Sequence, residues 1–370
     1  MPLATKNKMN APVISVIIPF YNRREYIDET IGSVRAQTFT DWEALIVDDG
    51  STDGSFEYVR DTFGNDPRIR ILQRTSAPKG ASHCRNIGIR ESRGKYLMFL
   101  DSDDLLAPTC LERRVRYFEK NSHCDFLVFN TVLFKENDPD HNYLWNVDSE
   151  ESDLCRFLRQ DVVWPTPGPV HRKEALLARD QWFDENLPFW QDFEFHTRYL
   201  FKQPVFRKFL HLEPDNFCRR HNSHSISQKS YGPSVKRVQR TKEKILDSIY
   251  RLINNQKHKR KDYKTNLAYN YIMISEDAFR YKLILFSYRI FTRLWLQRFI
   301  TLPDYIYLLV KQPLTILKIK NSRSPLLDKW EHAMKNLITK PIMFPHHQIL
   351  QVKHDQALPI KQPVTVEQKK

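Results

Sequence analysis

Three carboxylates directly follow an uncharged apolar run in the first third of the chain. The run covers residues 96–100, and Asp101, Asp103 and Asp104 come next. A short apolar run that contains aromatics is typical of a buried parallel strand, and open α/β sheets bind ligands at the carboxyl ends of their strands. Aspartates two positions apart can offer oxygens to one Mg²⁺ or Mn²⁺ that also binds phosphates. The alternative is an acidic loop that only caps the next helix.

Strand-like and helix-like segments alternate around this run. The expected strands are residues 13–19, 43–47, 70–73 and 95–100, and the expected helices are residues 25–37, 53–60 and 81–92. Alternation at this spacing predicts a parallel sheet whose polar turns share one edge. The side chains expected in one crevice at that edge are Tyr21, Asp48, Asp49, Asp101 and Asp103.

The middle of the chain is less regular. We expect a strand at residues 125–134, a loop at 136–152 and a helix at 193–201. Residues 164–169 contain three prolines, which exclude a helix and predict a rigid surface loop that carries Trp164. Long helices are expected from residue 235 onward.

Several blocks resemble those of the family 2 glycosyltransferases, in the same order. They are residues 15–22, 37–39, 47–53, 85–86, 94–104, 191–198 and 219–227. This resemblance covers about 60% of the chain. It implies an α/β GT-A fold: a Rossmann-like, mostly parallel mixed sheet flanked by helices, here followed by a helical C-terminal extension.

The resemblance also implies a reaction and a set of roles. The family transfers a sugar, with inversion, from a nucleoside diphosphate sugar to an acceptor hydroxyl, and a UDP-sugar is the expected donor. By position, Asp103 would bind Mn²⁺ or Mg²⁺, and Asp192 would be the catalytic base. The expected nucleotide-sugar-binding residues are Pro19, Tyr21, Asp48, Asp49, Arg85, Asp101 and Ser102.

Physical chemistry supports this division of roles. A divalent metal stabilises the charge of a departing diphosphate, and one carboxylate suffices to deprotonate an acceptor hydroxyl in an inverting attack. Asp192 has an alternative role as the N-cap of the helix after it. Gln191 stands where the family commonly has Glu, which removes a neighbouring charge and alters the expected pKa of the base.

Other candidates have weaker signals. His221 is a candidate metal or diphosphate ligand, with a solvated loop histidine as the alternative. Arg219 and Arg220 are candidate diphosphate ligands, of which only one is expected to point inward. Trp164 and Trp190 are acceptor-side candidates, and core packing is the alternative for both.

Charge divides the chain near residue 230. Residues 1–230 carry a net charge of −3, whereas residues 231–370 carry +17. Lys282, Arg289, Arg293 and Gln297 form one helical stripe among apolar residues. Basic, aromatic-rich amphipathic helices commonly bind the membrane interface, and anionic lipids strengthen that binding. The alternative is an ordinary helical subdomain packed on the catalytic core, or a dimer contact.

The expected organisation has four parts. They are a flexible N-terminus (1–12), a GT-A domain (13–230), a basic helical region (231–344) and a disordered tail (345–370). The five scattered cysteines suit a reducing compartment, and we find no signal peptide at the N-terminus. A cytoplasmic enzyme, peripheral at the inner face of the membrane, is therefore expected.

These features together favour a metal-dependent glycosyltransferase that builds a surface polysaccharide or a lipid-linked glycan. A sugar-phosphate nucleotidyltransferase is the nearest enzymatic alternative, but it would carry a Gly-rich basic loop where residues 19–22 read PFYN. A nucleic-acid-binding protein would use the basic C-terminal region but leave the acidic crevice without a purpose; no nucleic acid partner is expected. The intact carboxylates disfavour a catalytically inactive family member.

Overall fold

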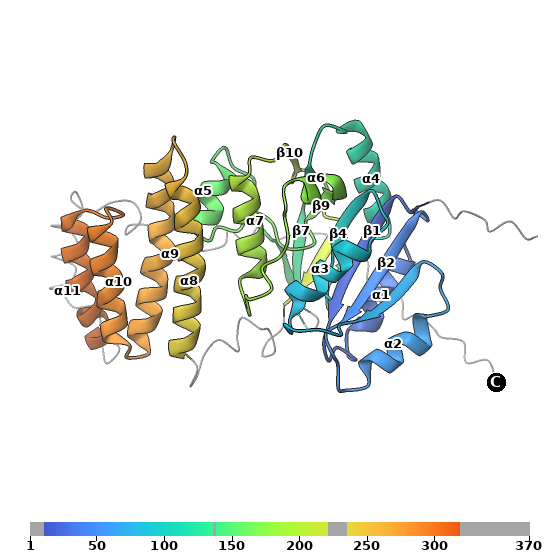
Figure 1. Cartoon of the computed structure of the whole chain (residues 1–370), viewed down its shortest axis with the longest axis horizontal. Coiled ribbons are helices and arrows are strands. Elements are labelled where there is room, and N and C mark those ends of the chain that lie inside the picture. Colours follow the sequence, from blue (N-terminus) through green and yellow to red (C-terminus); the bar gives the residue numbers. More distant parts are fainter. Residues whose placement is uncertain (1–10, 136–137, 221–234, 319–370) are drawn as a thin grey trace, which may run out of the picture.

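The computed structural model describes residues 11–135, 138–220 and 235–318. Two parts are visible along the long axis in Figure 1. A mixed α/β part lies at one end, and a stack of long helices extends from it toward the other end, with α11 outermost. This arrangement confirms the fold class expected from the sequence.

A seven-stranded sheet forms the centre of the α/β part. Its strands, in spatial order, are β10 (Phe206–Phe209), β6 (Phe126–Phe129), β9 (Pro169–Arg172), β4 (Tyr96–Phe99), β1 (Ile14–Phe20), β2 (Trp42–Asp48) and β3 (Ile69–Gln73). All pairings are parallel except those of β9, which runs antiparallel to β4 and β6. Every residue of β1, β2 and β4 is buried, as expected for a sheet covered on both faces.

Helices flank this sheet. They are α1 (Ile27–Arg35), α2 (Ser55–Phe63), α3 (Ala81–Glu91), α4 (Cys110–Lys120) and α6 (Lys173–Ala178). Helix α3 approaches β1 closely at Gly88, where an added Cβ would lie 2.3 Å from Cγ2 of Ile17. Only glycine fits there. Because glycine has no side chain, α3 can pack close to the sheet.

The strand predicted over residues 125–134 is two strands in different sheets, so that prediction was wrong. The break falls at Asn130, between β6 and β7 (Thr131–Lys135). The side chain of Asn130 donates to the Leu210 carbonyl (3.0 Å) and accepts from the Thr131 backbone N–H (3.0 Å). These side-chain bonds replace ladder bonds, so the chain can leave one sheet and enter the next.

The second sheet has four strands. Its order is β5 (Leu105–Leu106), β11 (Asn216–Arg219), β7 and β8 (Asp138–Leu144). Strand β8 occupies much of the loop predicted at residues 136–152, so that prediction was wrong in part. The segment is polar, but an edge strand needs one paired neighbour rather than an apolar sequence, and β7 supplies that neighbour.

The proline-rich segment at residues 164–169 is buried, which contradicts the surface loop predicted there. Its carbonyl groups find partners inside the protein. The Pro167 carbonyl accepts from Nη1 of Arg114 at 2.7 Å, and the Gly168 carbonyl accepts from the Phe129 N–H at 3.0 Å. Because these acceptors are satisfied, a rigid non-helical segment can lie in the core.

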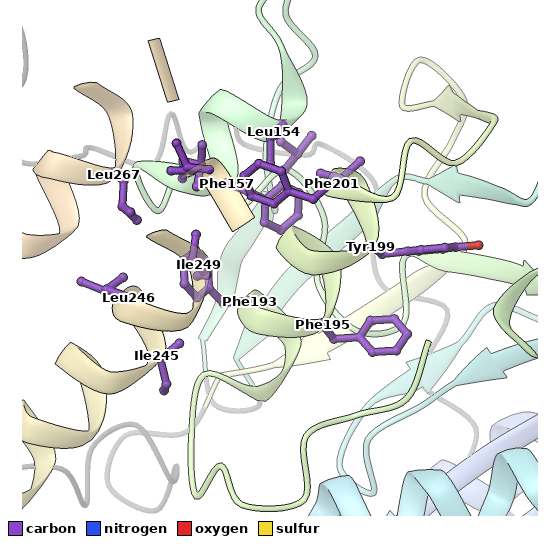
Figure 2. Packing of buried hydrophobic residues seen from close by; sticks show 14 of the residues in the cluster. Leu154, Phe157, Phe193, Phe195, Tyr199, Phe201, Ile245, Leu246, Ile249 and Leu267 are labelled. Atoms are coloured by element: carbon purple, nitrogen blue, oxygen red, sulfur yellow. The ribbon is translucent and has the colours of Figure 1, made fainter. Parts of the chain in front are cut away.

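The helical stack shares its hydrophobic core with the α/β part. The helices at this junction are α5 (Asp153–Leu158), α7 (Gln191–Phe201), α8 (Val235–Asn254) and α9 (Arg260–Arg280). Figure 2 shows Phe157 of α5, Phe193 of α7 and Ile249 of α8 in one cluster. The packing alternative therefore accounts for the inner side of the basic region, and the division into domains near residue 230 stays a prediction.

The stack continues outward through α10 (Ile284–Leu296) and α11 (Leu302–Lys318). None of the helices within the described ranges combines the length and the apolar character that crossing a membrane requires.

A buried ion pair joins α4 to the start of β11. Arg114 and Asp215 are both fully buried, with 2.6 Å between Nη2 and Oδ1. The same guanidinium holds the Pro167 carbonyl, so it connects three segments that are distant in sequence.

We predict that Arg114→Ala lowers the free energy of unfolding by about 3–5 kcal/mol, because Asp215 is left as a buried charge without its cation. Chemical denaturation measures the loss. Arg116→Ala on the exposed side of α4 is the matched control and should change stability by less than about 0.5 kcal/mol. Equal effects of the two variants would contradict the role assigned to the buried pair.

Candidate active site

The carboxyl ends of three adjacent parallel strands bring the predicted site residues together. Phe20 at the end of β1 pairs with Asp48 at the end of β2, and Ile17 pairs with Phe99 of β4. Tyr21, Asp49 and Asp101 therefore leave the sheet at the same edge. Arg23 also approaches Asp103, with 3.9 Å between Nε and Oδ2. The strand ends therefore share one edge of the sheet, as expected from the sequence.

Asp48 is fully buried and builds the turn that follows β2. Its carboxylate accepts hydrogen bonds from the backbone N–H groups of Gly50 and Ser51, from the Ser51 hydroxyl and from the Gln73 amide. Gly50 adopts a φ of +84°, a conformation that glycine allows at little cost. With its oxygens engaged in this way, Asp48 positions Asp49 rather than offering a ligand itself.

Asp49 is held through one of its two oxygens. Its Oδ1 accepts from Nε of Arg74 (2.6 Å), from the backbone N–H of Gly80 (3.0 Å) and from Sγ of Cys84 (3.7 Å). Burial, together with the charge of Asp49, raises the pKa of the Cys84 thiol to about 12, so it remains a proton donor at neutral pH. Within the described ranges, Oδ2 accepts none of these bonds.

The carboxylates of the segment after β4 have different environments. The Asp101 side chain is 38% exposed and that of Asp103 is 18% exposed, whereas Ser102 and Asp104 are buried. Asp104 accepts from the Arg219 backbone N–H (2.9 Å) and from Sγ of Cys218 (3.3 Å). Burial and the nearby charges of Asp103 and Asp101 raise the pKa of Asp104 well above its usual value. Asp104 therefore anchors the segment to β11, whereas Asp101 and Asp103 are partly exposed.

Arg85 on α3 connects this segment to α7. Its Nη2 donates to Oδ1 of Asp101 (2.5 Å), and its Nη1 donates to Oε1 of Gln191 (3.0 Å). The residue is 5% exposed, and its Nε is buried without a hydrogen-bond partner among the described residues. The guanidinium thus fixes the start of α7 against the strand ends.

Asp192 lies in the first turn of α7 rather than at its N-cap, because the helix begins at Gln191. The cap position is Trp190, whose φ is +57°. Oδ1 of Asp192 accepts from the Phe193 N–H at 2.8 Å. Burial raises the pKa of Asp192, and the nearby Arg85 cation partly offsets this effect.

Arg219 and Arg220 have separate environments, as expected for two adjacent residues. The Arg219 side chain is buried, pairs with Glu29 at 2.5 Å and donates from Nε to the Asp103 carbonyl at 2.9 Å. Arg220 is exposed. The inward-facing Arg219 therefore supports the Asp103 backbone.

The strand ends that carry these carboxylates lie within a region that matches a known family. Residues 15–184 match the family described as glycosyl transferase family 2. Over residues 15–184 the chain is thus similar to the family 2 glycosyltransferases. The resemblance expected from the sequence is confirmed, although the matched region ends before Asp192.

Three similar proteins define how far this similarity reaches. An uncharacterized glycosyltransferase of Haemophilus influenzae is 28% identical over 54% of this chain and 61% of its own length. A chondroitin synthase of Escherichia coli is 34% identical over 40% of this chain and 22% of its own length. The crystal structure of S. aureus TarS 1-349 in complex with UDP-GlcNAc covers 81% of this chain and 88% of that one, with 18% identity and a TM-score of 0.56.

The chain thus spans less than two thirds of the length of the Haemophilus relative. At 18% identity, the likeness to TarS shows a shared fold. Because its coverage exceeds the 15–184 match, that likeness also takes in much of the chain after residue 184.

The acceptor-side candidates and His221 have different outcomes. Trp164 is 1% exposed and packs against Phe126, Phe157 and Phe206, so the core-packing alternative describes it. Trp190 is half-buried beside Lys242 of α8, whose Nζ lies 5.2 Å from the ring centroid. His221 lies outside the described residues.

Pro19 is buried within β1, and Tyr21 is 38% exposed just after that strand. Nζ of Lys79 lies 3.3 Å above the centroid of the Tyr21 ring. The two residues therefore differ in their access to a ligand, and Tyr21 is the one with an exposed face.

Sequence reasoning missed the residues that brace the site. Asn22 adopts a φ of +50°, and its backbone N–H donates to the Ser51 hydroxyl at 3.0 Å. Its side-chain oxygen accepts from the Thr52 N–H at 2.8 Å. Asn22 thus joins the turns after β1 and β2. Asn22 could have been identified from the sequence, because asparagine tolerates positive φ. No sequence feature indicates that Arg74 pairs with Asp49.

The residues present fit a divalent metal that is completed by a substrate. Across residues 11–135, 138–220 and 235–318, no three His, Cys, Asp or Glu side chains gather into a complete metal cage. Asp103 nevertheless offers a partly exposed carboxylate at the strand edge. Mg²⁺ is commonly held by one or two carboxylates plus substrate phosphates, and this donor set suits that mode.

We predict that Asn22→Ala lowers the free energy of unfolding by about 2 kcal/mol, since alanine resists positive φ and cannot form the side-chain bonds. Asn22→Gly keeps the conformation and should lose less. Asn65→Ala, at an exposed position without positive φ, is the control. Urea unfolding separates these cases, and equal losses for the alanine and glycine variants would argue against backbone strain.

Proposed function

We propose that this protein transfers a sugar from a nucleoside diphosphate sugar, preferentially a UDP-sugar, to an acceptor hydroxyl with inversion at the sugar. The observation that carries the proposal is the Arg85 bridge. It holds Asp101, a proposed donor-binding residue, beside the start of the helix that bears Asp192. The proposed donor residue and the proposed base are thereby linked through one side chain.

The environment of Asp49 supports a role in reading the nucleobase. Its Oδ1 is fixed by Arg74 and Gly80, which leaves Oδ2 to accept from the N3–H of a uracil. A pre-oriented acceptor of this kind rejects bases that lack a donor at that position. The exposed Tyr21 ring would border the nucleoside, and Asp101 would approach the ribose. TarS, which shares the fold, has been crystallised with UDP-GlcNAc.

Asp103 is the proposed protein ligand of Mn²⁺ or Mg²⁺. When bound, the metal would neutralise charge on the departing diphosphate. Arg23, at 3.9 Å from Asp103, is placed to meet the same anionic group. Asp104 and Arg219 hold the backbone of this segment in place.

Asp192 is the proposed base. It is half-buried in the first turn of α7, and its raised pKa makes it a stronger base than an ordinary aspartate. The neutral Gln191 accepts from Arg85 without competing for its charge, so the cation continues to act on Asp192.

The proposed acceptor is a growing surface polysaccharide or a lipid-linked glycan. Trp190 immediately precedes the base segment and is half-buried, so its ring suits an apolar platform for a sugar face. The similarity to a chondroitin synthase agrees with a glycan acceptor.

A donor-binding experiment tests the first part. We expect UDP with Mn²⁺ to raise the melting temperature of the parent protein, because a ligand that binds only the native state stabilises it. Asp49→Ala should weaken UDP binding at least about tenfold by calorimetry, since a buried charge-assisted hydrogen bond is lost. Asp103→Asn should instead remove the dependence on Mn²⁺. Unchanged UDP affinity in Asp49→Ala would exclude the nucleobase assignment.

The second test concerns the base. Asp192→Asn retains an oxygen for the Phe193 N–H, so stability and donor binding should persist while transfer falls by about 10²-fold or more. The control is Glu194→Gln, because Glu194 is already paired with Arg198 at 2.6 Å. Near-parental transfer by Asp192→Asn together with a loss in Glu194→Gln would reassign the base to Glu194.

The pH profile of the parent gives an independent readout. The base works when deprotonated, so transfer should fall as the pH drops through the pKa of Asp192, which burial raises above the ordinary aspartate value. In Arg85→Gln the cation that lowers this pKa is absent, and the acidic limb should move to higher pH. An unmoved limb would separate Asp192 from the ionisation that controls transfer.

A further inference from the structure

In the part of the chain that the structure describes, most of the large exposed apolar side chains lie on α10 and α11. Eleven large hydrophobic residues in the described part are exposed, and eight of them lie between residues 281 and 310. They are Tyr281, Ile284, Leu285, Trp295, Leu296, Leu302, Ile306 and Val310. Single exposed apolar residues are ordinary, but such a concentration usually marks a contact surface.

On α10 these residues lie opposite the core. Leu285 is 86% exposed and Leu296 is 67% exposed, and they are eleven residues apart, which places them on one helical face. Arg289 lies on the same face, four residues after Leu285. The buried residues of α10, including Ile290 and Leu294, occupy the other side.

Helix α11 extends the same surface. Leu302, Ile306 and Val310 recur every four residues and are 50%, 45% and 37% exposed, whereas Leu308 is fully buried. The Trp295 and Tyr305 rings stack with centroids 5.2 Å apart, which joins α10 to α11. We call the exposed apolar residues of both helices, together with Arg289, the outer face. Figure 1 shows these helices at the end of the molecule farthest from the sheet.

The chain segment that forms the outer face is mostly basic, although Arg289 and Arg293 pair with acidic residues of α8. Residues 280–318 contain seven Lys and Arg and a single acidic residue, Asp304. Asp304 is fully buried and accepts from the Thr301 hydroxyl and N–H, both at 2.7 Å. Lys282 and Arg298 are exposed beside the apolar residues. The surface is therefore apolar with a basic surround.

The apolar and basic character of the outer face distinguishes between two possible binding partners. A second copy of the chain would bring the same positive charge to the contact, and repulsion would oppose pairing. An anionic lipid surface matches both properties, because acyl chains accept the apolar side chains and headgroups attract the cations. We infer that the outer face of α10 and α11 docks this protein on an anionic lipid surface.

The outer face differs from the basic stripe expected from the sequence. Arg293 of that stripe pairs with Asp247 at 2.8 Å and with Glu243 at 3.3 Å, both on α8, and Arg289 also reaches Glu243 at 2.6 Å. Leucine and isoleucine side chains supply most of the contact instead. The inference needs no assumption about the reaction, although it would bring the proposed enzyme to a lipid-linked acceptor.

Cosedimentation of the full chain with vesicles tests the inference. We expect the parent to bind vesicles of phosphatidylcholine with phosphatidylglycerol, and to bind phosphatidylcholine alone much more weakly. The triple variant Leu285→Gln, Leu296→Gln, Ile306→Gln should bind at least about tenfold more weakly. Lys282→Gln and Arg298→Gln should each cost about fivefold. The matched control is Leu177→Gln, Val205→Gln, at exposed apolar positions in the α/β part, and it should bind as the parent does.

Parental vesicle binding by the triple variant would overturn the inference, as would equal binding of the parent to neutral and anionic vesicles. Light scattering addresses the second copy: a parent dimer that the triple variant converts to a monomer, with vesicle binding unchanged, would assign the outer face to self-association. UDP stabilisation, measured on the same proteins, should be identical in parent and triple variant. If UDP stabilised neither the parent nor the triple variant, the proposed function would be contradicted, but the vesicle-binding result would still stand.

Discussion

The Arg85 guanidinium is the contact on which the geometry of the site depends. It stands on α3, which β1 positions, and reaches both the segment after β4 and the first residue of α7. A charged group this buried is stable only with good partners, so its two contacts restrict where those segments can lie. A Glu at position 191 would draw on the same cation and leave less of its field for Asp101 and Asp192. Because Gln191 is neutral, the Arg85 charge acts mainly on Asp101 and Asp192.

The carboxylates at the strand edge divide according to how fully their oxygens are engaged. Asp48 accepts several hydrogen bonds and Asp104 accepts two, and both hold the backbone of their turns. Asp49 has only Oδ1 engaged by Arg74 and Gly80, and the side chains of Asp101 and Asp103 are partly exposed. Two adjacent aspartates, such as Asp48 and Asp49, can therefore serve unlike purposes. The spacing of residues alone does not reveal which is which.

The sequence predicted the first four strands of the sheet well, because each is an apolar run that ends in polar residues. The shared edge of Tyr21, Asp49 and Asp101 followed from that pattern. Prediction from the sequence failed where contacts with residues distant in the chain determine the local structure. The break at Asn130 depends on the Leu210 carbonyl, and the burial of residues 164–169 depends on Arg114. Trp164 and Arg293 also looked available in the sequence but are engaged by residues far along the chain. The catalytic, donor and metal roles stay predictions, since geometry alone does not test them.

The close approach of α3 to β1 has a consequence for how this protein tolerates substitution. Gly88 follows Arg85 by three residues, so both lie within one turn of the same helix. Even a methyl group at Gly88 would meet the Ile17 side chain at 2.3 Å, and relief would require lifting α3 from the sheet. Arg85 would move with it. A saturation mutagenesis screen for activity would then score Gly88 as severely as a ligand-binding residue, although Gly88 has no side chain with which to bind a ligand.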